Sequence, residues 1–154
     1  MFLECFRKLA LAHPKIEPAE MIVDATAMNM VKNANKLDVI VTENLYGDIL
    51  SDLAAGLVGG LGIVPGANIG TEAAIFEAVH GTAPDIAGLG VANPTALIQS
   101  AVMMLHHIGE ADAGNRIERS LITLYKRGET RTGDLGGTAT TAQFTDALCK
   151  LVAA

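Results

Sequence analysis

Three aspartates have the residue type and the spacing that a divalent metal site needs. Asp48 and Asp52 are four residues apart, so on a helix they share one face and lie one turn from each other. Asp24 follows a short apolar run and could supply a third carboxylate. Carboxylate oxygens are the hard ligands that Mg²⁺ and Mn²⁺ prefer. The structural alternatives stay open: Asp48 and Asp52 could lie in the first two turns of a helix, where the dipole favours acidic residues, and Asp24 could be a helix N-cap.

A second candidate site is the Gly- and Pro-rich segment from His80 to Gly88, with the sequence HGTAPDIAG. Small residues let a ligand approach the backbone closely, so this segment could clamp a nucleotide; the alternative is a well-made turn with a surface histidine. A Rossmann fingerprint is absent, because the GLG at residues 60–62 is not followed by the third glycine. The sequence also has no P-loop and no HExxH motif. The adjacent His106 and His107 diverge on a helix, so we interpret them as ordinary helix histidines.

Both helices and strands are predicted around these residues and must position them. Apolar spacing predicts a helix that starts near Phe2 and ends before Pro14. Three short apolar runs predict strands, at residues 21–23, 37–42 and 74–79, and those at 37–42 and 74–79 are expected to be buried. Further helices are predicted up to about residue 31 and over residues 46–57, 94–108, 111–127 and 143–152, with loops at 80–93 and 130–140. Strands that alternate with helices indicate an α/β fold.

Composition excludes several classes of protein. The 154 residues are 50% hydrophobic and 18% charged, which excludes intrinsic disorder. Two uncharged stretches, 53–71 and 86–109, contain Gly, Pro, Asn or Gln and could not satisfy their backbone as one helix in lipid, so we expect a soluble protein with no membrane partner. Scattered basic residues and a net charge of −6 argue against nucleic acid. Cys5 and Cys149 have no metal-site spacing and give no disulfide framework, which indicates a reducing compartment. The charged N-terminal residues are not typical of a signal peptide.

Several motifs in order resemble those of the β-decarboxylating dehydrogenases, the family of isocitrate, homoisocitrate, isopropylmalate and tartrate dehydrogenases. The segment NLYGDILSD at residues 44–52 is similar to the family's metal-binding signature. The segments at residues 59–70 and 76–84, GGLGIVPGANIG and FEAVHGTAP, resemble the isocitrate branch more than the isopropylmalate branch. NPT at residues 93–95 and DLGG at residues 134–137 complete the pattern, and the resemblance covers essentially the whole chain.

The resemblance implies an oxidative decarboxylation that depends on Mg²⁺ or Mn²⁺. A nicotinamide cofactor takes hydride from the C2 alcohol of a 2-hydroxy tricarboxylate such as isocitrate, the β-keto acid loses CO₂, and the enol is protonated. The metal polarises the alcohol and stabilises the enolate. Asp48 and Asp52 are then expected to ligate the metal beside one subunit's substrate, and Asp24 to reach into the partner subunit's site. The family implies a homodimer or higher oligomer with shared active sites.

The same resemblance places the cofactor on the second candidate site. The expected cofactor-binding residues are His80, Gly81, Thr82, Ala83, Asp85, Ile86, Asn93 and Asp134. The pair Asp85 and Ile86 stands where NADP-type enzymes tend to have Lys and Tyr. A carboxylate can accept hydrogen bonds from ribose hydroxyls and would repel a 2′-phosphate, so we predict NAD rather than NADP.

The resemblance also implies that the chain is the C-terminal half of such an enzyme. The family's catalytic Tyr and Lys have no counterpart, and Lys8 lies past the lysine motif, so no catalytic residue is assigned and the chain alone is expected to be inactive. The family fold, which is not a Rossmann fold, implies that residues 1–58 belong to the small domain and dimer interface, and residues 59–154 to the large domain with its cofactor loops. Apolar surface meant for the absent half and the partner also predicts self-association of the isolated chain.

Three readings of the function follow. The first is an NAD-dependent isocitrate dehydrogenase of the tricarboxylic acid cycle. The second is a homoisocitrate or isopropylmalate dehydrogenase. The third is a non-catalytic regulatory subunit of a hetero-oligomeric isocitrate dehydrogenase, which need not keep its metal carboxylates. The three retained aspartates favour a catalytic subunit. The expected location is the cytoplasm of a bacterium, or the mitochondrial matrix if the source is eukaryotic.

Overall fold

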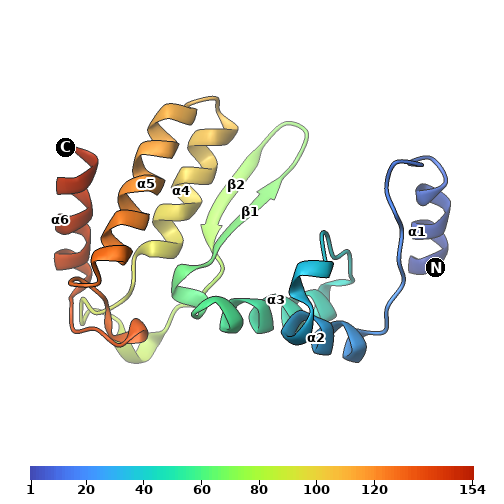
Figure 1. Ribbon diagram of the computed structural model, residues 1–154, viewed down its shortest axis with the longest axis horizontal. Helices are drawn as coiled ribbons and strands as arrows, with labels where there is room; N and C mark the ends of the chain where they lie inside the picture. The colour runs from blue at the N-terminus through green and yellow to red at the C-terminus, as the bar shows by residue number, and fades with distance from the viewer. The chain divides into compact units, whose positions relative to one another are not determined.

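Six α-helices and one small antiparallel sheet make up the computed structural model, which describes all 154 residues (Figure 1). Residues 1–57 and residues 58–154 form two separate compact units. The division falls one residue before the boundary predicted at residue 58, and the assignment of the units to a small and a large domain stays a prediction. Helices together with a sheet confirm the α/β class in this coarse sense. None of the helices combines the length and the apolar character needed to span a membrane.

The first unit contains three helices. They are α1 (Phe2–Ala10), α2 (Val23–Lys32) and α3 (Asn44–Val58), the last of which runs one residue into the second unit. All three were predicted. Arg7 of α1 makes a bidentate ion pair with Glu20, with its Nε 2.5 Å and its Nη2 2.6 Å from the two carboxylate oxygens.

Two predicted strands of the first unit are wrong. Residues 21–23 form no strand, because Met21 and Ile22 are irregular and Val23 already begins α2. Residues 37–42 form no strand either, and Val39 is 80% exposed. A strand needs a neighbour to take up its backbone N–H and C=O groups, and the unit holds no strand beside this run. The apolar composition of this run therefore predicted both a strand and its burial wrongly.

The sheet lies in the second unit. Strand β1 (Pro65–Ile69) pairs antiparallel with β2 (Ala74–Ala78), and Ile69 lies opposite Ala74. The prediction for β2 is confirmed in position, but its burial was wrong, because one face of the hairpin is open and Ile75 is 63% exposed. Strand β1 was not predicted, since its Pro and Gly hid it within a glycine-rich stretch.

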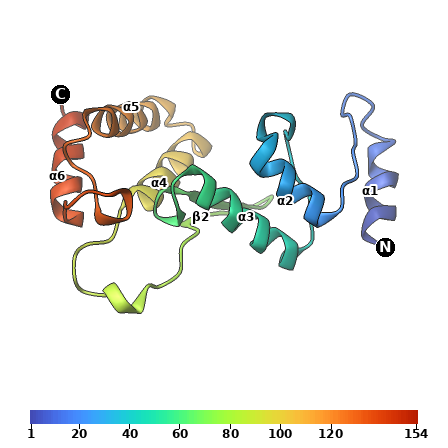
Figure 2. The ribbon, with the colours of Figure 1, turned by 60° about the horizontal axis from the view of Figure 1, so that its bottom comes forward.

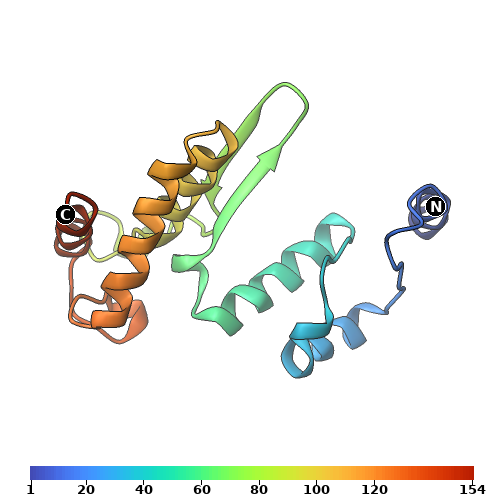
Figure 3. The same cartoon turned by 45° about the horizontal axis from the view of Figure 1, so that its top comes forward.

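Helix α4 (Thr95–His107) packs against the hairpin, α5 (Ala111–Arg127) packs against α4, and α6 (Thr141–Val152) packs against α5, so that the three helices form a row beside the hairpin (Figure 3). The core lies between α5 and α6, where Phe144 is fully buried among Leu121, Leu124 and Leu148. Helix α5 ends at Gly128, whose φ of 71° closes the helix in the left-handed conformation, as predicted. This row of helices holds the segments before α4 and after α5 that carry the candidate site.

Candidate functional site

The two aspartates of α3 are exposed and free of internal partners. Asp48 and Asp52 lie one turn apart, and neither carboxylate makes a hydrogen bond or an ion pair. The first turn of α3 contains no acidic residue, so both lie beyond the region where the helix dipole acts strongly. The alternative reading of these two residues as dipole-stabilising carboxylates is therefore disfavoured, and their acceptor sites are open to a cation.

Asp24 lies in the first turn of α2, two positions after the N-cap residue. Ile22 is the N-cap residue, so the alternative reading of Asp24 as an N-cap is wrong. The Asp24 Oδ1 accepts a hydrogen bond from the backbone N–H of Ala25 at 2.6 Å, and the side chain is exposed. The single chain gathers no group of three His, Cys, Asp or Glu side chains that could hold a metal ion. The role expected for Asp24 is in a partner subunit's site, so the metal assignment stays a prediction.

The loop between β2 and α4 is open to solvent along almost its whole length. Every residue from His80 to Ala92 is exposed, including the predicted cofactor residues Gly81, Thr82, Asp85 and Ile86. Figure 2 shows the loop standing out from α4, α5 and α6, with a short 3₁₀ turn, Pro84–Ile86, at its far point. The loop is thus a surface on which a ligand could lie.

One residue of this loop has an uncommon backbone conformation. Ala83 has a φ of 43°, the only positive φ at a residue other than glycine, and it immediately precedes the 3₁₀ turn. An L-residue in this region costs of order 1 kcal/mol and is often found at functional sites. His80 Nδ1 lies 3.0 Å from the Gly81 carbonyl oxygen, which bends the start of the loop. Ala83 and His80 therefore give the loop a defined path although neither is buried.

The far end of the loop is tied to the first turn of α6. The Thr141 backbone N–H donates to the Gly90 carbonyl at 2.8 Å, and its Oγ1 donates to the Ala92 carbonyl at 2.5 Å. The first N–H groups of a helix have no partner within the helix, so Thr141 is able to serve the loop. The neighbouring Thr140 and Gln143 cap α6 by a reciprocal capping box.

Asn93 and Asp134, both predicted as cofactor residues, are brought together although 41 residues separate them. Asn93 Nδ2 donates to Asp134 Oδ2 at 2.9 Å, and Asn93 Oδ1 accepts from the Thr95 backbone N–H at 3.0 Å. Asn93 is only 8% exposed, whereas Asp134 is at the surface. Because both ends of the Asn93 amide are engaged, a ligand beside it would meet mainly its backbone groups and the Asp134 carboxylate.

Three further residues complete this network and were missed by sequence reasoning. Thr132 is fully buried and donates from Oγ1 to Asp134 Oδ1 at 2.5 Å. The Tyr125 hydroxyl lies 2.5 Å from Thr95 Oγ1 and 3.5 Å from Asn93 Nδ2. Thr132 lies only two residues before Asp134, but the sequence gives no sign that the two side chains would pair. Nothing in the sequence indicates Tyr125, since it comes from another helix.

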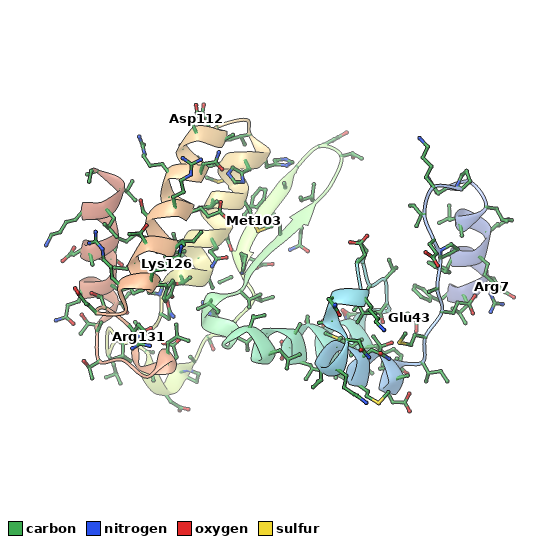
Figure 4. All side chains as sticks on the ribbon, in the orientation of Figure 1. Arg7, Glu43, Met103, Asp112, Lys126 and Arg131 are labelled. Carbon is green, nitrogen blue, oxygen red and sulfur yellow. The ribbon has the colours of Figure 1, made fainter.

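The turn that carries Asp134 is shaped by its glycines. Gly136 has a φ of 72°, and a Cβ at Gly137 would lie 2.0 Å from the Arg131 carbonyl oxygen. Arg131, labelled in Figure 4, lies in the turn that follows α5. The Gly137 N–H donates to the Thr132 carbonyl at 3.0 Å, and the Ala139 N–H donates to the Arg131 carbonyl at 2.9 Å. The DLGG motif thus forms a tight turn whose Gly137 N–H binds the carbonyl of the buried Thr132.

The concave part of the second unit lies elsewhere. A crevice of about 230 Å³ between α4 and α5 is lined by Gln99, His106, Glu118 and Tyr125 together with apolar residues. It includes no residue of the His80–Ala92 loop. The predicted cofactor residues therefore form an exposed surface and not a closed pocket in the single chain.

The comparisons with known proteins define the class. The family model for isocitrate/isopropylmalate dehydrogenase matches residues 1–148, so the chain belongs to this family. Among curated relatives, it is 52% identical over 149 residues to the probable mitochondrial isocitrate dehydrogenase [NAD] subunit alpha of Drosophila melanogaster, covering 97% of this chain and 40% of that protein. It is 54% identical over 148 residues to the isocitrate/homoisocitrate dehydrogenase of Thermus thermophilus, covering 96% and 44%.

A solved structure gives the same result. The isocitrate dehydrogenase of Methylococcus capsulatus superposes with a TM-score of 0.93 at 55% identity, over 98% of this chain and 45% of that one. The chain therefore spans less than half the length of the relatives it matches. The resemblance inferred from the motifs is confirmed at the level of the family.

Proposed function

We propose that this chain is the C-terminal portion of an NAD-dependent, metal-dependent isocitrate dehydrogenase. The observation that carries the proposal is the exposed loop that contains Asp85 and leads into Asn93, which is hydrogen-bonded to Asp134. The chain that holds this loop is 52% identical to a relative named as an isocitrate dehydrogenase [NAD] subunit. The reaction transfers hydride from C2 of isocitrate to NAD, breaks a carbon–carbon bond to release CO₂, and protonates the resulting enol to give 2-oxoglutarate. The C2 hydroxyl releases one proton during the oxidation, and the enol takes up one proton after CO₂ is lost, so the two proton steps balance.

The cofactor is proposed to lie along the loop with its adenosine side toward Asp134. His80, Gly81, Thr82 and Ala83 would line the first part, and Asp85 and Ile86 would meet the ribose. Asp85 is exposed and makes no ion pair, so its oxygens are free to accept the ribose hydroxyl protons. The loop contains no Lys or Arg that could neutralise a 2′-phosphate. These features support NAD over NADP.

The donors available on α3 fit a hard divalent cation. Two unpaired carboxylates, Asp48 and Asp52, would hold Mg²⁺ or Mn²⁺, which normally keeps water and substrate oxygens for its other positions. When bound, the cation supplies Lewis-acid stabilisation of the negative charge that develops on the substrate oxygen. Asp24 is proposed to serve the site of a partner subunit, which makes the enzyme a homodimer or a higher oligomer.

The activity belongs to the whole enzyme. We propose that the present chain alone has no dehydrogenase activity, since it spans less than half the length of its relatives and no catalytic acid or base has been assigned in it. The Drosophila relative is named as mitochondrial, and a eukaryotic source would place this protein in the matrix and a bacterial one in the cytoplasm. Homoisocitrate is the second candidate substrate, because the name of the Thermus thermophilus relative includes it.

Calorimetric titration of the purified chain with NAD and with NADP tests the cofactor assignment. We expect NAD to bind more tightly, and Asp85→Lys to reverse the preference by removing a carboxylate and adding a cation for the 2′-phosphate. Asp112→Lys is the matched control, because Asp112 lies at the exposed start of α5 and changes the net charge equally. Equal binding of both cofactors by the unchanged chain would contradict the NAD assignment, and isocitrate turnover by the chain alone would contradict the proposed inactivity.

A further inference from the structure

The hydrogen bonds behind Asp134 have a consequence for ligand binding. Asp134 is at the surface, yet each of its two carboxylate oxygens is already held from within, by Thr132 and by Asn93. A carboxylate has about four acceptor positions, so about two remain for a ligand. A side chain fixed at both oxygens loses little further rotamer freedom when a ligand binds, which favours affinity.

The buried end of the network is equally specific. Thr95 and Thr132 are both fully buried, and every buried polar side-chain atom of the chain has a hydrogen-bond partner. The Tyr125 ring packs against Phe144 with centroids 5.7 Å apart, so its hydroxyl is held by the core while it contacts Thr95 and Asn93. The network thus joins three segments: the end of the 80–92 loop at Asn93, the last turn of α5 at Tyr125, and the turn that contains Asp134.

We infer that Thr132 and Tyr125 are positioning residues for the adenosine side of the cofactor site. Thr132 fixes the direction of the Asp134 carboxylate, and Tyr125, through Thr95, fixes the Asn93 amide that holds the other oxygen. The remaining Asp134 acceptor positions then face solvent in one orientation, suited to a neutral hydrogen-bond donor such as a ribose hydroxyl or an adenine amino group. The inference rests on the proposed NAD function and deepens it.

Gly62 supports this arrangement from the glycine-rich segment before β1. A Cβ at Gly62 would lie 3.0 Å from Asp134 Oδ2 and 3.4 Å from the Asn93 Cβ. Only a residue without a side chain leaves the Asn93 to Asp134 bond undisturbed. The glycine therefore leaves room for the carboxylate in the orientation that Thr132 selects.

The test is the affinity of the full chain for NAD, measured by calorimetry on four variants. Thr132→Val removes the hydroxyl while keeping the shape, and we expect the NAD dissociation constant to rise about tenfold. Thr132→Ser restores the hydroxyl and should stay within about twofold of the unchanged chain. Tyr125→Phe should weaken NAD binding about threefold, because Tyr125 acts on Asp134 only through Asn93 and Thr95. Thr123→Val is the matched control, since Thr123 bonds only to the Arg119 carbonyl of its own helix.

Hydrogen exchange followed by mass spectrometry separates positioning from folding. We expect Thr132→Val to speed exchange in residues 132–139 and to leave α6 unchanged. A merely structural role would lower the unfolding midpoint of Thr132→Val while the folded protein bound NAD normally, and that result would overturn the inference. If the unchanged chain binds NAD and Thr132→Val binds it equally well, the inference fails and the proposed function stands. If the unchanged chain binds no NAD, the proposed cofactor site fails and the inference fails with it. If Thr132→Val does not fold, the NAD affinity of Tyr125→Phe is the test, and an unchanged affinity overturns the inference.

Discussion

Replacement of Gly137 by alanine is predicted to destabilise the second unit through a clash with main-chain atoms. The added Cβ would lie 2.0 Å from the Arg131 carbonyl oxygen and 2.4 Å from its carbonyl carbon. Contacts of a Cβ below 3.0 Å are essentially never found, so the Arg131 carbonyl would have to move by about 1 Å. That movement would strain two backbone hydrogen bonds, from Gly137 to Thr132 and from Ala139 to Arg131.

The magnitude follows from these contacts. Overpacking against main chain costs about 1–3 kcal/mol, and each weakened hydrogen bond adds up to about 1 kcal/mol, so we expect a loss of about 2–4 kcal/mol. Two neighbours calibrate the effect. Gly136→Ala has free space but a φ of 72°, which predicts a loss of about 1 kcal/mol, and Gly133→Ala has free space and an ordinary φ, which predicts almost none.

Urea unfolding followed by tyrosine fluorescence measures this series. The chain has no Trp and only two Tyr, one in each unit, so a Tyr46→Phe background makes Tyr125 the reporter of the second unit. The slope of the free energy of unfolding against urea should be unchanged across the series. Equal stability of the Gly137→Ala and Gly133→Ala proteins would refute the argument from the close approach to Arg131.

Two further predictions concern the loop and the ion pair of α1. Thr141→Val should speed hydrogen exchange around Ala92 by removing the side-chain bond to the loop, whereas Thr145→Val, which loses only a bond within α6, should leave the loop unchanged. The hydrogen bond and charge of Arg7 lower the pKa of Glu20, so their contribution to stability is present above the unfolded carboxyl value near pH 4.3 and is lost as the pH falls through the folded value. Titration by NMR should show the Glu20 pKa rising in Arg7→Gln, and an unchanged value would mean that the ion pair does not form in solution.

Helices were predictable from the sequence because their signals are local. The boundary of α5 at Gly128 follows from one glycine after a periodic run, and the observed φ of 71° is the reason. Strands depend on partners that the local sequence does not name. Residues 37–42 have strand composition and no neighbour, while β1 has Pro and Gly and pairs with β2 across a short turn.

Sequence reasoning predicted the residues proposed to meet the cofactor, but not the residues that hold them in place. Asn93 and Asp134 were found through a family resemblance, and their contact at 2.9 Å joins segments that no local pattern relates. Thr132 contacts Asp134 within one turn, whereas Tyr125 reaches Thr95 and Asn93 only after α5 packs on α4. Their residue types are common in any sequence, so only the packed structure indicates their position behind Asp134.

The spacing of these contacts along the chain has a consequence for the order of folding. The β1 and β2 pair closes across the four residues 70–73, whereas the Asn93 to Asp134 bond joins residues 41 apart. Closing a loop roughly ten times longer costs about 2 kcal/mol more in chain entropy, so the hairpin is expected to form early and the Asn93 network late. The geometry of the proposed cofactor site would then be acquired last during refolding, after most of the helical circular dichroism signal has returned.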